Sequence, residues 1–147
     1  MARPNKILVA YDGSPHSQKA LEWAIDLSHC SSGKMIAVYV SEPVEILSLY
    51  TSESGIRMKD AIKELEERGR DKLEEAKTFC ASRGVDVKTV FLHGNIAHTI
   101  INYAKNEQAD LIIAGTKGHG ELEEMLMGSV TRNLVSLSSI PVLVVKD

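Results

Sequence analysis

Short, unbroken apolar runs recur along the chain, separated by longer segments whose apolar residues have helical spacing. The clearest runs cover residues 7–10, 35–40, 111–114 and 142–145. Apolar runs without polar alternation are typical of parallel strands that helices cover on both faces. A fifth run, residues 85–92, alternates in part between apolar and polar positions. It therefore predicts a less covered strand at one edge of the sheet.

Four further segments have the pattern of amphipathic helices. The first follows Ser14, a favourable N-cap, and starts with Pro15, which suits the first helical position. The longest extends from about residue 59 to residue 83, with Gly84 as its C-terminal glycine and Gly69 as a weak point in its middle. We expect the buried stripes of the four helices to contain Ala20, Leu21, Trp23, Ala24 and Leu27; Ile62, Leu65, Leu73, Ala76 and Cys80; Ala97, Ile100, Ile101 and Ala104; and Val130, Leu134 and Leu137.

Strand and helix alternate four times before a final strand, and this order predicts the fold class. We expect an α/β protein with an open five-stranded parallel sheet and helices on both faces, joined by right-handed crossovers. The 147 residues suit a single domain, residues 1–147, with one core. Residues 42–58 form a long apolar connection, which fits either a lid or partner surface or an extra helical turn packed on the core.

The predicted sheet also indicates where a ligand binds. In open parallel sheets, ligands bind beyond the carboxyl ends of the strands, at the point where the strand order reverses. The candidates are therefore the residues that follow the predicted strands, namely 11–13, 41–42, 93–95 and those from Gly115 onward.

Three glycines after the fourth predicted strand stand at fixed offsets. They are Gly115, Gly118 and Gly128, and Ser129 follows the last of them at the start of the fourth helix. The first turn of a helix has unpaired amides and a positive potential that attract phosphate, and glycine lets a ligand oxygen approach the backbone. We expect the two glycine bends to converge, so that their amides, with the hydroxyls of Ser129 and Thr131, surround a polyphosphate.

Other phosphate motifs and other partner classes find less support. There is no G-x-x-x-x-G-K-[ST] loop, and the first strand is followed by YDGSPHS instead of G-x-G-x-x-G. The net charge of −3 argues against a nucleic-acid partner, although it leaves room for a local basic patch. No apolar run is long enough to span a membrane, and the opening residues lack a secretion segment. We therefore expect a cytoplasmic protein with no membrane partner.

The cysteines and histidines form no chemical motif. Cys30 and Cys80 are too few for a disulfide framework, and their helical surroundings predict two buried thiols. No two of the five histidines stand four residues apart, and no H-E-x-x-H motif occurs, so a zinc enzyme is not expected.

The pattern Gly115-x2-Gly118-x9-Gly128-Ser129 resembles the ATP-binding motif of the universal stress protein family. The opening KILVAYDGSPHSQKALEWA and the closing GSVTRNLVSLSSIPVLVVKD resemble the same family, so the likeness covers the whole chain. It implies a Rossmann-like, adenine nucleotide α hydrolase-like sheet of order 3-2-1-4-5 and a homodimer paired through the fifth strand, residues 142–145. The dimer also has support from the residues themselves, because an apolar strand at a sheet edge needs a cover that a second copy supplies.

The resemblance assigns roles in an ATP site, residue by residue. It implies that Asp12 lies beside the ribose and phosphates, which is compatible with a role of Asp12 in capping the following turn. It also implies that the main chain of Val40 meets the adenine edge and that Gly115 and Gly118 flank the ribose and phosphates. By the same resemblance, the phosphates are held by Gly128, Ser129, Val130 and Thr131, and the base is walled by Ala10 and Tyr11.

The resemblance implies an ATP-binding regulatory protein of a stress response, without separating ATP from AMP or ADP. Carboxylates between residues 121 and 124 crowd the proposed phosphates. Mg²⁺ or Mn²⁺ would offset that repulsion, although exposed helix-flank charges explain these residues as well. No catalytic residue is assigned, because Lys117, His119 and Asp12 include no well-placed general base. A slow ATPase or phosphotransferase and a ligand-free structural dimer remain as alternatives.

Overall fold

The computed structural model describes residues 3–42, 55–117 and 127–146, with side chains from residue 59 onward in the second range. Gly118, His119, the carboxylates between 121 and 124, and most of the predicted irregular connection lie outside these residues. The strands are β1 (Lys6–Ala10), β2 (Lys34–Ser41), β3 (Lys88–His93), β4 (Leu111–Gly115) and β5 (Val142–Val145), and the helices are α1 (Pro15–Ser31), α3 (Gly55–Ser82), α4 (Ile96–Asn106) and α5 (Ser129–Leu137).

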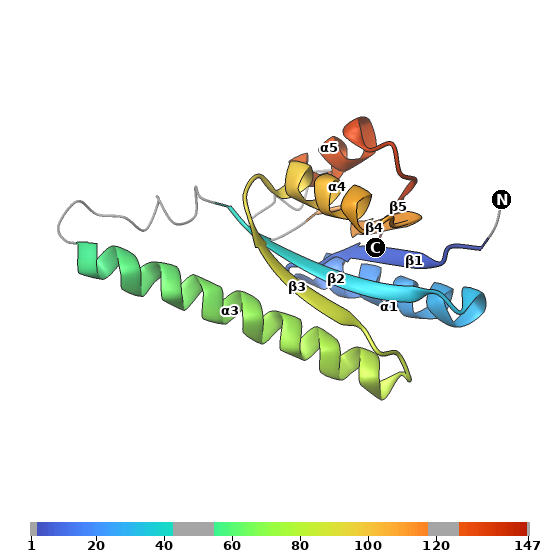
Figure 1. Cartoon of the computed structure of the whole chain (residues 1–147), viewed down its shortest axis with the longest axis horizontal. Helices are drawn as coiled ribbons and strands as arrows, with labels where there is room; N and C mark the ends of the chain where they lie inside the picture. The colour runs from blue at the N-terminus through green and yellow to red at the C-terminus, as the bar shows by residue number, and fades with distance from the viewer. Residues whose placement is uncertain (1–2, 43–54, 118–126, 147) are drawn as a thin grey trace.

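The strands form one parallel sheet of order β3-β2-β1-β4-β5, as predicted (Figure 1). The weakly alternating strand is β3, and it lies at the sheet edge, although it starts only at Lys88. The strand order reverses between β1 and β4, because the chain builds β2 and β3 on one side of β1 before it crosses to the other side. That reversal marks the expected ligand position.

Two layers of helices cover the sheet, with α1 and α3 on one face and α4 and α5 on the other (Figure 1). Alternate residues of β1 supply the two cores: Ile7 and Val9 face α1 and α3, whereas Leu8 faces α4 and α5, and all three are fully buried. This burial on both faces explains the unbroken apolar runs in the sequence.

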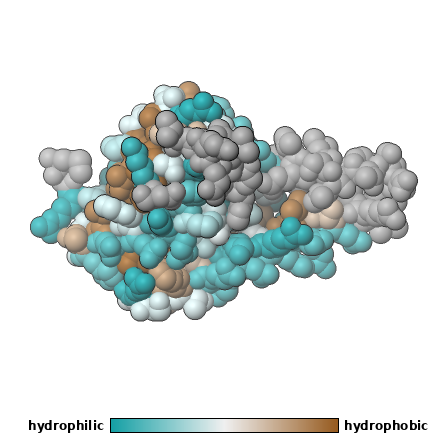
Figure 2. Space-filling view, turned by 180° about the vertical axis from the view of Figure 1, so that it is seen from behind, coloured by the Kyte–Doolittle hydropathy of each residue, from teal (hydrophilic) through white to brown (hydrophobic). Residues whose placement is uncertain are grey.

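The start of α1 and the end of α3 follow the predicted signals, whereas α3 starts at Gly55, before the predicted residue 59. Ser14 caps α1 by accepting from the amide of Ser17 at 3.2 Å, with Pro15 as the first helical residue. Gly84 adopts a left-handed conformation (φ +78°) after α3, as expected of a C-terminal glycine. The first half of α3 projects past the carboxyl ends of β2 and β3 (Figure 1), and beyond residue 58 the surface of this half that Figure 2 shows is mainly hydrophilic.

Three burial predictions are wrong. Trp23 is 54% exposed and Leu137 is 51% exposed, and Cys30 is also exposed, whereas Cys80 is buried. Trp23 and Cys30 lie on the flank of α1, beyond the strip that touches the sheet, and Leu137 is the last residue of α5. Within the described ranges, no helix is both long enough and apolar enough to cross a bilayer.

Candidate functional site

A cavity of about 260 Å³ lies at the carboxyl ends of β1, β2 and β4, where the strand order reverses. α4 closes one side of it, and the first turn of α5 closes another. Its lining includes Ala10, Tyr11, Asp12, Val40, Gly115, Ser129, Val130 and Thr131, all of which belong to the predicted site. Gly128 is the N-cap of α5, directly before Ser129, and Gly118 lies outside the described residues.

Two hydrogen bonds hold the end of β4 against the start of α5. The amide of Gly128 donates to the carbonyl of Thr116 at 2.7 Å, and the hydroxyl of Thr131 donates to the carbonyl of Gly115 at 2.7 Å. The bends at Gly115 and Gly128 therefore converge, as the sequence predicts. The same bonds narrow the set of phosphate donors, because the Gly128 amide and the Thr131 hydroxyl proton are already used.

Gly115 has a packing reason to be glycine that the sequence did not indicate. A Cβ at this position would lie 2.6 Å from the carbonyl oxygen of His16, in the first turn of α1. α1 therefore approaches β4 closely at the edge of the cavity. Because the obstructing atom belongs to the backbone, a side chain here would displace the helix.

The first turn of α5 presents amides with no side-chain cap. α1 and α4 start at Ser14 and Asn95, whose side chains accept from backbone amides, but α5 starts at Gly128 and has no side-chain cap bond. The first intrahelical bond there joins the amide of Arg132 to the carbonyl of Gly128 at 3.0 Å. The amides of residues 129–131, which precede it, thus carry the positive potential of the helix start, and all three residues line the cavity.

Asp12 and Tyr11 contribute to the cavity in different ways. Asp12 accepts from the amide of Ser14 at 2.9 Å, which confirms its capping role in the turn before α1. The ring of Tyr11 is only 5% exposed and belongs to the core beneath α1 and α3. Burial, with a smaller contribution from Glu75, raises the pKa of the Tyr11 phenol, which therefore stays neutral. The Tyr11 ring thus contributes mainly to core packing beside the cavity.

Several lining residues were not selected from the sequence. Ile100 was predicted only as part of the buried stripe of α4, and it does pack in the core as well as lining the cavity, whereas Ile96, the first residue of α4, was not singled out. Glu42 directly follows β2, and residues 41–42 were candidates for ligand binding because they follow a predicted strand. The remaining additions are Ser17, Val38, Tyr39, Ala114 and Lys117.

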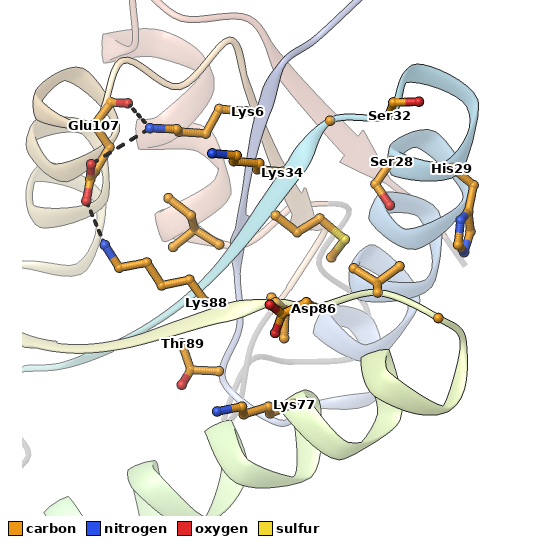
Figure 3. Close-up of a pocket in the computed structure, with 16 residues that line it drawn as sticks. Lys6, Ser28, His29, Ser32, Lys34, Lys77, Asp86, Lys88, Thr89 and Glu107 are labelled. Atoms are coloured by element: carbon orange, nitrogen blue, oxygen red, sulfur yellow. Dashed lines mark hydrogen bonds and ion pairs between the residues drawn. The ribbon is translucent and has the colours of Figure 1, made fainter.

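A larger cavity, about 880 Å³, lies at the opposite, amino ends of the strands (Figure 3). It is lined by four lysines, two of which, Lys6 and Lys88, form ion pairs with Glu107 at 3.9 and 3.1 Å. Lys6 also donates to the Glu107 carbonyl at 2.8 Å, and a ring nitrogen of His29 lies 2.8 Å from the Arg83 carbonyl.

These contacts explain Lys6, Lys88 and His29 without a ligand. α1, α3 and α4 all end at this edge, and the carboxyl end of each helix carries partial negative charge. The cationic groups offset that charge and satisfy terminal carbonyls. Hydrogen bonds from Tyr103 and Lys88 lower the pKa of Glu107, which keeps its carboxylate available for the lysines.

Thr131 offers a direct test of the link between β4 and α5. We expect Thr131→Val to lower the free energy of unfolding by about 1–3 kcal/mol, because the buried Gly115 carbonyl loses its donor. Thr131→Ser keeps the hydroxyl, so its free energy of unfolding should fall much less. Urea denaturation of the three proteins measures the difference, and equal midpoints for Val and Ser would show that this bond does not hold the two bends together.

Comparison with known proteins identifies relatives over the full chain. The sequence model of the universal stress protein family matches residues 4–146. Universal stress protein YxiE of Bacillus subtilis is 36% identical over 149 aligned positions, covering 97% of this chain and 99% of its own. The solved structure of MJ0577, a Methanocaldococcus jannaschii universal stress protein, superposes with a TM-score of 0.88 at 29% identity, covering 99% of this chain and 98% of its own.

More distant solved structures share the fold and hold nucleotides. One is a universal stress protein in complex with cAMP, with 22% identity, a TM-score of 0.71, and coverage of 99% of this chain and 98% of its own. Another is an Arabidopsis thaliana family member with AMP bound, with 21% identity, a TM-score of 0.70, and coverage of 97% of this chain and 92% of its own. At these identities the likeness supports the fold alone.

Proposed function

The chain belongs to the universal stress protein family, and from that premise we propose that it binds an adenine nucleotide in the cavity at the carboxyl ends of β1, β2 and β4. The observation that carries this proposal is the uncapped first turn of α5, which faces a cavity at the reversal of strand order. Donor amides at a helix start bind phosphate without a lysine clamp.

The nucleotide then lies across the strand ends. Its phosphates meet the amides of residues 129–131, its ribose lies over Asp12 at the end of β1, and its base reaches Val40 near the end of β2. Ala10, in the cavity floor, packs against the nucleoside. Three adjacent donors suit more than one phosphate, so ATP is the proposed physiological ligand, ahead of AMP or ADP.

The proposed role is nucleotide-dependent regulation in a cytoplasmic stress response, carried out by a homodimer paired through β5. Mg²⁺ or Mn²⁺ enters with the triphosphate as its counter-ion. No group of three or more histidine, cysteine or carboxylate side chains suited to a metal lies among the residues that the structure describes.

Ser129→Pro tests the phosphate end without disturbing the fold. Proline is favoured at the first helical position, and Gly128 already has the extended conformation (φ −72°, ψ 165°) that a following proline requires. The substitution removes one amide donor, so we expect the affinity for ATP to fall about 10- to 100-fold, as for loss of a hydrogen bond to a charged group. Isothermal titration calorimetry measures this change.

Two comparisons make the result specific. Ser129→Ala keeps the amide and loses only the hydroxyl, which proline lacks as well, so it should retain more ATP affinity than Ser129→Pro. Adenosine, which has no phosphate, should bind both variants equally. Failure of the wild-type protein to bind ATP at millimolar concentration, together with absence of nucleotide from freshly purified protein by mass spectrometry, would reject the proposed function.

A further inference from the structure

The nucleotide cavity is lined by amide donors from one element and by an acidic residue that follows another. The donors belong to the first turn of α5, and the acidic residue is Glu42, directly after β2. We propose that Glu42 accepts a hydrogen bond from the 6-amino group of adenine and makes the site selective for adenine over guanine nucleotides. This inference rests on the proposed nucleotide function and extends it to the recognition of the base.

The position of Glu42 fits the base end of the ligand. β2 and β4 are both hydrogen-bonded to β1, so they stand two strand spacings apart, or roughly 10 Å. The phosphates lie at the α5 start, which hydrogen bonds hold against the end of β4. The nucleoside must therefore cross β1, where Asp12 occupies the ribose position, before its base reaches β2 and Glu42.

The chemistry of Glu42 also fits adenine. An ionised carboxylate only accepts hydrogen bonds, and adenine presents an amino donor at its 6-position, where guanine presents a carbonyl acceptor. Glu42 is half-buried, and among the described residues it has no hydrogen bond or ion pair. A guanine carbonyl at the same place would face a carboxylate with no proton between them, and that repulsion disfavours guanine.

The test compares nucleotides that differ at one group. Wild type, Glu42→Ala and Glu42→Gln are titrated with ATP, with purine riboside triphosphate, which lacks the 6-amino group, with GTP and with 2′-deoxy-ATP. We expect the wild type to bind ATP about 10- to 100-fold more tightly than purine riboside triphosphate, the range of a hydrogen bond to a charged acceptor. In Glu42→Ala this ratio should fall to about 1, through weaker ATP binding alone.

Glu42→Gln gives a second, independent readout. A glutamine amide both donates and accepts, so it serves adenine through its oxygen and guanine through its nitrogen. We expect this variant to bind GTP at least about tenfold more tightly than the wild type does, while losing less ATP affinity than Glu42→Ala. A pocket that merely lost a negative charge would gain affinity for ATP and GTP alike.

The failures are distinguishable. An equal ratio of ATP to purine riboside triphosphate affinity in wild type and Glu42→Ala would reject the role of Glu42 while nucleotide binding stands. Suppose instead that Glu42→Ala no longer discriminates between ATP and 2′-deoxy-ATP, while its ratio of ATP to purine riboside triphosphate affinity equals that of the wild type. That result would show that the carboxylate contacts the ribose, and it would overturn the proposal. A wild-type protein that binds none of the four would reject both this inference and the proposed function.

Discussion

Replacing Gly69 with alanine should destabilise the protein by about 2 kcal/mol, and the same replacement should stabilise it by about 1 kcal/mol once Phe91 is shortened to valine. The reason for the first effect is the close approach of α3 to β3. A Cβ on Gly69 would overlap the edge of the Phe91 ring and lie 3.0 Å from Tyr39 Cε1. Neither ring moves away easily, because the two stack with centroids 5.5 Å apart and Arg70 lies over Phe91.

The second effect follows when the ring is gone. In a helix interior alanine is favoured over glycine by about 1 kcal/mol, so only the collision makes Gly69 advantageous. Valine suits a strand and has no atoms beyond Cγ, and its smaller size lets Tyr39 shift away from the new methyl group. The two backgrounds should therefore differ by about 3 kcal/mol in the effect of the same substitution, as expected of residues in contact.

Urea denaturation of the wild type, both single variants and the double variant measures this coupling. Phe91→Val alone lowers stability, so each effect is read within its own background, with equal m-values as a check on two-state unfolding. If Gly69→Ala had the same sign in both backgrounds, the glycine would be explained by backbone conformation and the proposed ring contact would be rejected.

Gly69 and Gly115 illustrate what the sequence could not supply. From the sequence, Gly69 was interpreted as a weak point in a helix, and Gly115 as a residue that lets a phosphate approach the backbone. In the structure each lies where a neighbouring element comes too close for a side chain: β3 at Gly69 and α1 at Gly115. Such contacts join residues far apart in the chain, and a local pattern carries no information on the distance between packed elements.

The parallel sheet and the cavity position were predictable because they depend on local signals that repeat, whereas the strand order followed from the family resemblance. Apolar runs mark strands, caps mark helix starts, and chain topology then restricts the arrangement. The flanks of helices were less predictable. Trp23 extends the apolar stripe of α1 in the sequence, but whether that flank is covered depends on which neighbour stands beside the helix. α3 shares one face of the sheet with α1, and Trp23 stays exposed.

The candidate site was predictable in outline and less so in its donors. The convergence of the two glycine bends followed from placing both at the carboxyl ends of the strands. The Gly128 amide donates to Thr116, the residue after β4, and the Thr131 hydroxyl donates to the last residue of β4. Both bonds depend on the separation of α5 and β4, which no spacing in the sequence encodes. Glu42 stands after β2 in the sequence, but its place in the cavity lining, without a partner among the described residues, is visible only in three dimensions.

The exposed hydrophobic side chains support a second copy as the partner of β5. Trp23, Val135 and Leu137 are each at least 50% exposed, and they belong to α1 and α5, the two helices that contact β5 from opposite faces of the sheet. β5 itself is an edge strand. A two-fold-related copy that pairs with β5 can bury exposed apolar residues of these two neighbouring helices, and the pairing of the two edges satisfies their free backbone groups.

Val144→Pro should convert the proposed dimer to a folded monomer. The carbonyl of Pro141 accepts from Ile112 of β4 at 2.9 Å, and strand residues alternate in direction, so the main-chain groups of Val144 point away from β4. Proline there removes an outward donor while the bonds to β4 remain, and we expect the dimer dissociation constant to rise at least about 100-fold. Light scattering against the 16.1 kDa chain mass measures this change.

Val144→Thr is the matched control, because threonine is also β-branched and keeps the amide. It should remain dimeric under the same conditions. Circular dichroism should show that the proline variant keeps its helices and sheet, which separates loss of pairing from loss of fold. A proline variant that keeps the dimer mass would mean that the copies meet elsewhere. A monomeric wild type would reject the proposed dimer.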